Sequence, residues 1–180
     1  MSQCADTGQL QGPTAIYEIA QLLMVAVRDQ LAQSLGGKVN RACVVPGDIA
    51  ADDCECGALA VSAQRFFLSE DFPETSDTGG GFRTSPCDVP WLVAEITVQV
   101  FRCAPQPGEG KLAPTCAQQD AAAKILLSDA YVTLTTVVST LCALSDANRI
   151  IDYILGEQQT EGGDGGCVGT SLTVQVGIPR

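Results

Sequence analysis

The stretch WLVAEITVQVFRC, residues 91–103, decides the fold of this chain. Successive side chains of a strand point to opposite faces of a sheet, and apolar and polar residues alternate along this stretch. One face carries only apolar residues, namely Leu92, Ala94, Ile96, Val98 and Val100. The other face carries Glu95, Thr97 and Gln99. The pattern predicts a strand of an antiparallel sheet with one buried face and one solvated face.

Three other segments are expected to be strands. One begins at Gly57, where Leu59 and Val61 start an alternation with small and polar residues. The other two are RIIDYIL, residues 149–155, and SLTVQVGI, residues 171–178. In the second of these segments, every second residue is apolar. The segment between these two, residues 156–169, is acidic and rich in glycine, so it is expected to be a connecting loop.

Two segments have the periodicity of helices. In residues 14–35, apolar side chains recur every three or four positions, which predicts an amphipathic helix. Pro114 suits the start of a second helix that runs to about residue 145. The β-branched residues of the segment 132–138 favour a kink or break of that helix near Ser128 and Asp129.

These segments predict an α+β fold in the order α-β-β-α-β-β, with an antiparallel sheet of about four strands packed on two long helices. A chain of 180 residues suits a single domain, residues 1–180. Residues 1–12 are expected to be a flexible N-terminus. Residues 70–90 contain three consecutive glycines and many small polar residues, which predicts a long mobile loop.

The formal net charge of −11 argues against ordinary nucleic-acid binding, because the ten basic residues are scattered and form no basic run. An acidic wall would instead repel DNA that passes near it. The N-terminus has neither a basic start nor an apolar stretch, so no signal peptide is expected. The longest uncharged stretch, residues 130–145, is shorter than the roughly 20 residues that cross a bilayer. We therefore expect a chain made in the cytoplasm, with no membrane contact.

The sequence offers little for catalysis. It contains no histidine, which is the commonest general base near neutral pH, and no GxSxG motif. The glycine runs at residues 79–81 and 162–166 lack the Lys and the Ser or Thr of a phosphate-binding loop. We expect that the protein is not an enzyme and uses no cofactor.

Two acidic groups are the nearest candidates for a metal site. Asp52, Asp53 and Glu55 alternate with thiols in the segment DDCEC, but no second group of ligands lies nearby in the sequence, which favours a solvated turn. A second group, Glu157, Glu161 and Asp164, lacks the ligand spacing of a calcium-binding loop. No bound metal is expected.

Nine cysteines are present, with no CxxC pair. Free buried thiols and disulfides formed outside the reducing cytoplasm are both open interpretations, and an odd number leaves at least one thiol unpaired. Cys103 ends the strand at residues 91–103, and Cys116 lies near the start of the second helix. A disulfide between them would close the short loop that joins these elements, and two unrelated thiols are the alternative.

Four runs of sequence resemble tail terminators or neck proteins in phages of actinobacteria. They are VVPGDIAADDCECGALAVSAQRFF (44–67), SPCDVPWLVAEITVQVFRCAPQP (85–107), TCAQQDAAA (115–123) and GGCVGTSLTVQVG (165–177). The resemblance covers roughly residues 14–178 and depends on the order and spacing of these runs. Where the family pattern has Trp ahead of the double Asp, this chain has Ala51.

The resemblance implies an α+β subunit of a virion, located at the junction of tail and neck and assembled in the host cytoplasm. Such subunits form a hexameric ring on the last ring of the tail tube, stop tube growth and join the head-side connector. The partners it implies are further copies of the chain, the major tail tube protein and the connector or stopper, while DNA passes through the lumen.

In such a ring, the two acidic groups at residues 52–55 and 157–164 are expected in loops that face the lumen or the rim. The subunit contacts are expected to use the polar strand face of Glu95, Thr97 and Gln99. Two alternatives are another neck protein, such as a connector or stopper, and a cysteine-rich binding domain stabilised by disulfides.

Overall fold

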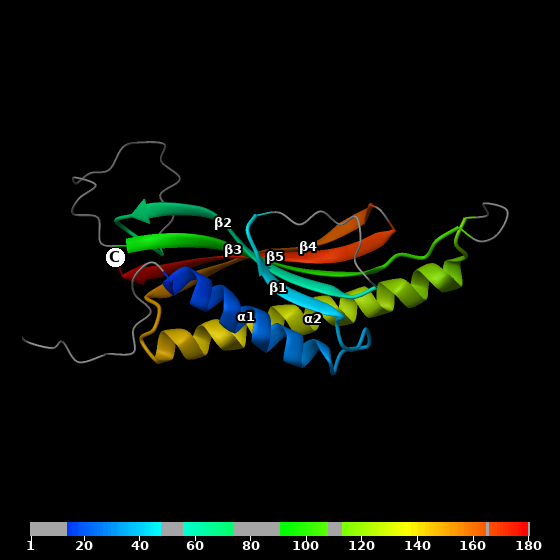
Figure 1. Ribbon diagram of the computed structural model, residues 1–180, viewed down its shortest axis with the longest axis horizontal. Helices are drawn as coiled ribbons and strands as arrows, with labels where there is room; N and C mark the ends of the chain where they lie inside the picture. The colour runs from blue at the N-terminus through cyan, green and yellow to red at the C-terminus, as the bar shows by residue number, and fades with distance from the viewer. Residues whose placement is uncertain (1–13, 48–55, 74–90, 108–112, 165, 180) are drawn as a thin grey trace, which may run out of the picture.

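The computed structural model describes residues 14–47, 56–73, 91–107, 113–164 and 166–179. A five-stranded sheet forms one layer, and two helices form a second layer on one face of that sheet (Figure 1). The elements in chain order are α1 (Ala15–Leu31), β1 (Arg41–Val45), β2 (Ala58–Ser69), β3 (Trp91–Cys103), α2 (Cys116–Asp146), β4 (Asp152–Asp164) and β5 (Cys167–Pro179).

The strand order across the sheet is β1-β2-β3-β5-β4, and β1 is parallel to β2 while the other neighbours are antiparallel. The expected antiparallel sheet of about four strands in the order α-β-β-α-β-β is therefore wrong, since the order is α-β-β-β-α-β-β. The missed strand is β1, whose five residues RACVV are too short for a clear alternation. Parallel neighbours are also not joined by a tight hairpin, so no turn signal pointed to this pair.

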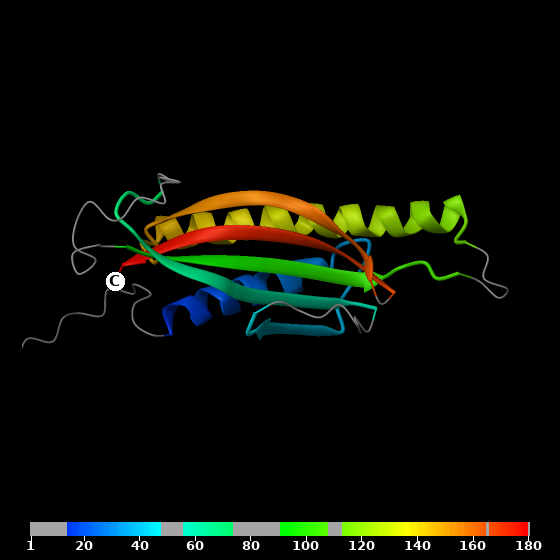
Figure 2. The same cartoon turned by 90° about the horizontal axis from the view of Figure 1, so that it is seen from above.

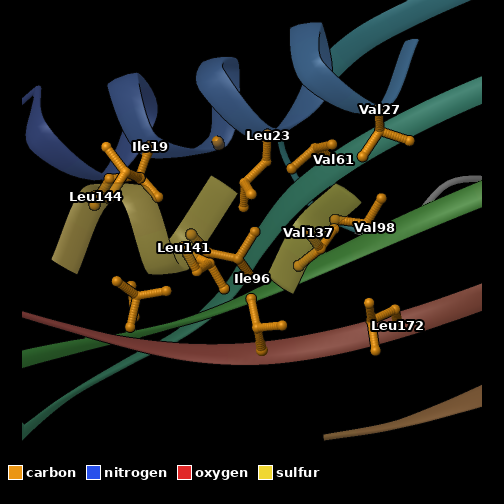
Figure 3. Close-up of a cluster of buried hydrophobic side chains, with 14 of the residues drawn as sticks. Ile19, Leu23, Val27, Val61, Ile96, Val98, Val137, Leu141, Leu144 and Leu172 are labelled. Atoms are coloured by element: carbon orange, nitrogen blue, oxygen red, sulfur yellow. The ribbon is translucent and has the colours of Figure 1, made fainter. Parts of the chain in front are cut away.

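The hydrophobic core lies between the helices and the sheet, as Figure 3 shows. On the β3 side, the core includes the fully buried Ile96 and Val98, which confirms the predicted apolar face of that strand. On the helix side, the core takes one row of side chains from each helix. These rows are Ile19, Leu23 and Val27 of α1 and Val137, Leu141 and Leu144 of α2.

The helices differ from their expected bounds. α1 ends at Leu31, and Leu35 lies beyond it with 67% of its surface exposed. α2 begins with a capping box in which Thr115 and Gln118 satisfy each other's backbone N–H groups. The helix is continuous from Cys116 to Asp146, so the expected break near Ser128 and Asp129 is absent.

The N-terminal part of α2 projects past the ends of the strands, and Figures 1 and 2 show this from two directions. From residue 116 to residue 127 its side chains are exposed or half-buried. By length and composition alone, α2 is apolar enough to cross a membrane, but core helices of soluble proteins share that property.

The acidic, glycine-rich segment at residues 156–169 is a strand hairpin and not the loop expected from its composition. β4 runs on to Asp164, and β5 begins at Cys167. Two irregularities in the β4–β5 pairing, one between Leu155 and Gln158, accommodate the glycines. At Gly156 a Cβ atom would come within 2.6 Å of the carbonyl oxygen of Thr173, so this position of the strand requires glycine.

Two leucines of α2 provide a matched test of this core. Leu141 is fully buried, while Leu127 is 63% exposed on the projecting part of the same helix. We expect Leu141→Ala to lower the free energy of unfolding by about 2–5 kcal/mol, because it leaves a cavity between the layers. Leu127→Ala should change it by less than about 0.5 kcal/mol. Urea unfolding of the isolated subunit measures both, and equal losses would contradict this packing.

Candidate functional site

A buried ion pair links β3 and α2 to the segment that follows α1. The Arg102 Nε atom donates to Asp129 Oδ2 at 2.7 Å, and the two side chains are 8% and 0% exposed. The Arg102 guanidinium also donates to the carbonyl oxygen of Gly37 at 2.7 Å, and the Ser34 hydroxyl donates to Asp129 Oδ1. Both buried charges therefore have hydrogen-bond partners besides each other, which offsets part of their desolvation cost.

The backbone around this ion pair is closely fitted to it. A Cβ atom at Gly36 would lie 2.7 Å from Arg102 Nη2 and from Asp129 Oδ2, so only glycine fits there. Sequence reasoning missed this pair, although a signal was present. Arg102 continues the even-numbered, core-facing positions of β3, and Asp129 is in helical phase with Thr133 and the buried Val137.

The three polar residues of β3 expected at a subunit contact make hydrogen bonds within the chain. Glu95 accepts from Arg65 and from Gln175, each at 3.2 Å. Thr97 and Gln99 are only 3% and 8% exposed, so the prediction of a fully solvated face is wrong. Alternation identifies the face of a side chain, but it does not reveal that the neighbours of a central strand cover that face. A contact role for these residues stays a prediction, and Glu95, whose side chain is 22% exposed, is the most accessible of them.

The two acidic groups have different outcomes. Asp52, Asp53 and Glu55 lie outside the described residues. Glu157, Glu161 and Asp164 all belong to strand β4, so the acidic loop expected around them is a strand at the edge of the sheet. Glu157 is exposed, and Glu161 is half-buried and accepts a hydrogen bond from the Gln99 amide at 3.0 Å.

The disulfide expected between Cys103 and Cys116 is absent, because Cys103 is bonded to Cys56 and Cys116 is a free, exposed thiol. The sheet register explains the pairing. Ala58 of β2 is the partner of Phe101 of β3, so Cys56 and Cys103 each lie two residues beyond that pair and come together, with their Cα atoms 4.5 Å apart. Nearness in sequence favoured Cys116, whereas strand pairing selects Cys56. Cys167, opposite Cys103 in the pairing of β3 with β5, is also disulfide-bonded.

A thiol–phenol contact connects α2 to the edge strand β4. Cys142 Sγ lies 3.0 Å from the Tyr153 hydroxyl. This hydrogen bond, assisted by partial burial, raises the pKa of Tyr153 above its ordinary value, because it favours the protonated phenol. The contact holds β4 against the helix layer.

The part of the chain that the structure describes has few clusters of side chains that could bind a metal or a ligand. No group of three or more His, Cys, Asp or Glu residues there is placed to hold a metal ion. An open groove between the helices contains one carboxylate, Asp29, and small or polar neighbours. It is lined by Ala26, Asp29, Gln30, Thr135, Thr136, Ser139 and Thr140.

Large apolar side chains are exposed on the helix layer. Leu127 and Tyr131 are one helical turn apart on α2, on either side of Asp129 where the helix leaves the sheet, and they are 63% and 69% exposed. Tyr17, on α1, is 55% exposed. We call Leu127 and Tyr131, together with the exposed Ala123 one turn before Leu127, the projecting apolar surface. Aromatic and apolar residues gathered on an exposed surface are typical of protein–protein contacts.

No known protein family and no curated protein sequence matches this chain. A solved structure of the sheath/tube terminator of an extracellular contractile injection system, PVC, in its extended state is similar with a TM-score of 0.27 and 12% sequence identity. The match covers 89% of this chain and 56% of that one, so this chain spans little more than half of that protein's length. A TM-score this low carries no argument about function.

The buried ion pair gives a prediction with an exposed pair as its control. Asp129→Ala should destabilise the subunit by about 3–5 kcal/mol, because it leaves the Arg102 charge buried without its carboxylate. The double variant Arg102→Met with Asp129→Ala should lose less than the sum of the losses in Arg102→Met alone and Asp129→Ala alone. Arg65→Met removes the ion pair with Glu95, in which the Arg65 side chain is 63% exposed. This change should lower the free energy of unfolding by less than about 1 kcal/mol. Strictly additive losses at Arg102 and Asp129 in urea unfolding would rule out the coupling.

The Cys56–Cys103 bond closes a loop with a sequence separation of 47. For that length, chain entropy predicts a stabilisation of about 4 kcal/mol. Replacing both cysteines by alanine should therefore lower the free energy of unfolding of the oxidised protein by up to about that amount. Cys116→Ala, at a free exposed thiol, should have little effect. Peptide mapping without reductant should recover the linked peptides, and a Cys103–Cys116 link would overturn the pairing.

Proposed function

We propose that this chain is a structural subunit of a tailed phage that caps the tail tube as a ring, stops tube growth and joins the tail to the head-side connector. The observation that supports the proposal most is the projecting apolar surface, together with the sequence resemblance to tail terminators. A helix that extends past its own sheet with Leu127 63% and Tyr131 69% exposed is suited to cover a neighbouring protein.

A purely structural role fits the chemistry of the described residues. Their buried charges, Arg102 and Asp129, bond to each other and to the segment after α1, which leaves neither charge available to a substrate. We therefore propose that the protein is not an enzyme and needs no cofactor. The partners are further copies of the chain in a ring of six, the tube protein and the connector.

The charge of the subunit also suits a ring around DNA. Each copy carries a formal net charge of −11, and phosphate passing through an acidic lumen is repelled and not held. Like charge on six copies opposes their association and is screened by salt. Ring formation should accordingly become easier as ionic strength rises, or when a tube end holds the subunits together.

Purified protein added to growing tail tubes tests the proposal. The tubes should stop at a defined length and carry one ring at one end, seen by electron microscopy. Leu127→Ser with Tyr131→Ser should abolish or strongly reduce capping without unfolding the subunit, because both side chains are exposed. Tyr17→Ser, at an exposed tyrosine on α1, is the control and should still cap.

Two outcomes contradict the terminator role, and a third contradicts the assignment of the projecting apolar surface. Tube length that is unchanged by the wild-type protein excludes the terminator role. A ring that binds the head-side connector but never binds the tube would instead identify a connector or stopper. Loss of capping in the double variant with loss of its folded circular dichroism spectrum would show that Leu127 and Tyr131 act in folding.

A further inference from the structure

We propose that the sheet edge β1 of one copy pairs with the sheet edge β4 of the next, so that neighbouring subunits share one continuous sheet. This inference rests on the proposed function, because it assigns the contact between subunits of that ring. It places the contact at the two edges of the sheet, and not on the polar face of β3.

Both edges can accept another strand. Among the described residues, no strand pairs with the outer side of β1 or of β4. An outer edge presents a row of backbone N–H and C=O groups, which is a template for a strand from another chain. On β4, Leu155 is 37% exposed and Glu157 is exposed as well, so this edge is accessible along its middle.

The directions of the strands fit such a pair. β1 is parallel to β2, and the direction then reverses at each step from β2 to β3, to β5 and to β4. β1 and β4 therefore run in opposite directions, so the edges of two adjacent copies would form an antiparallel pair. Since the two edges differ, the contact is head-to-tail, and such contacts close into rings when the rotation permits.

The register places opposite charges at the same level on the two edges. Arg41 is paired with Ala58, Ala58 with Phe101, Phe101 with Gly169, and Gly169 with Glu161. Residues paired in this way share a face of the sheet. The hydrogen bond from the Gln99 amide to Glu161 places that carboxylate on the face opposite the helices, and Arg41 belongs to the same row. In the simplest register, Arg41 of one copy meets Glu161 of the next.

The charges of the two edges favour a contact between β1 and β4 over a contact between two β4 strands. Residues 36–47 contain Lys38 and Arg41 and no carboxylate, whereas β4 contains four carboxylates and no basic residue. Unlike edges therefore attract, and two β4 edges repel each other. A guanidinium has five N–H donors, so a contact from Arg41 to the next copy is compatible with contacts inside its own chain.

The length of the regular part of β4 also matches β1. The two irregularities in the pairing of β4 with β5 flank the stretch from Gln158 to Glu161. Through the paired rows, that stretch lies level with residues 44 to 41 of β1. Because β4 is irregular on both sides of this stretch, a neighbouring β1 strand could pair regularly only with these four residues. The irregularities therefore keep β4 from pairing with β1 in another register.

A native thiol allows a direct test. Cys43 of β1 is free, and the row through Ala60, Gln99 and Ser171 ends at the exposed Gln159 of β4. In a background of Cys116→Ser and Cys142→Ser, Gln159→Cys should give a ladder of disulfide-linked oligomers after mild oxidation of assembled protein. The ladder should end at the number of copies in the ring, and peptide mapping should recover residue 43 linked to residue 159.

Two controls define the contact. Cys43→Ser should abolish the ladder, and Thr160→Cys, on the other face of β4, should reduce its yield at least tenfold. If cysteines introduced singly at positions 157 to 161 never link to Cys43 while the parent protein still forms rings and caps tubes, the edge contact is overturned and the proposed function stands. If the parent protein neither forms rings nor caps tubes, the proposed function fails.

Discussion

Arg102 and Asp129 meet where α1 ends, where β3 ends and where α2 leaves the sheet, and their contact joins these three places. Each charge is buried, so separating them would leave a charge without compensation in an apolar surrounding. Ser34, Gly36 and Gly37 fit around the pair, which fixes the turn after α1 as well. The part of α2 that precedes Asp129 projects past the strands, and its side chains from residue 116 to residue 127 are exposed or half-buried. Its direction therefore depends on this ion pair and on the core beneath the rest of the helix.

The molecule has two kinds of surface that could contact other proteins. Along the strands, α2 extends past the sheet (Figure 2), and Leu127 and Tyr131 are exposed on that helix near the point where it leaves the sheet. Across the strands, the sheet ends in a basic edge at β1 and an acidic edge at β4. The first surface could contact a tube or connector while the second joins copies of the chain, so one small subunit could serve both contacts.

Much of the fold could be predicted from periodicity. The strand at residues 91–103, the buried face of Ile96 and Val98, and the helical segments follow directly from the spacing of apolar residues. β1 could not be found in this way, because a five-residue parallel edge strand has neither a long alternation nor a hairpin turn. Composition misled at residues 156–164, where glycine and acidic residues form bulged strand and not loop.

The candidate site was harder to predict, because its contacts join residues far apart in sequence. The choice of Cys56 over Cys116 as the partner of Cys103 follows from strand register, which requires the sheet to be known. Arg102 and Asp129 each lie on an otherwise apolar face of their own element, but the periodicity of the sequence gives no reason to pair one with the other. The acidic character of residues 157–164 was visible in the sequence, but its position on a sheet edge was not.

Imaging the protein bound to tail tubes at a resolution that separates strands tests the central claim most directly. The account predicts one closed ring at one end of each tube, with the sheet of each subunit continuing into its neighbour through β1 and β4. It also predicts that the projecting part of α2 is covered by another protein chain. A map in which the protein is absent from the tube ends, or in which α2 projects into solvent in every copy, would contradict it.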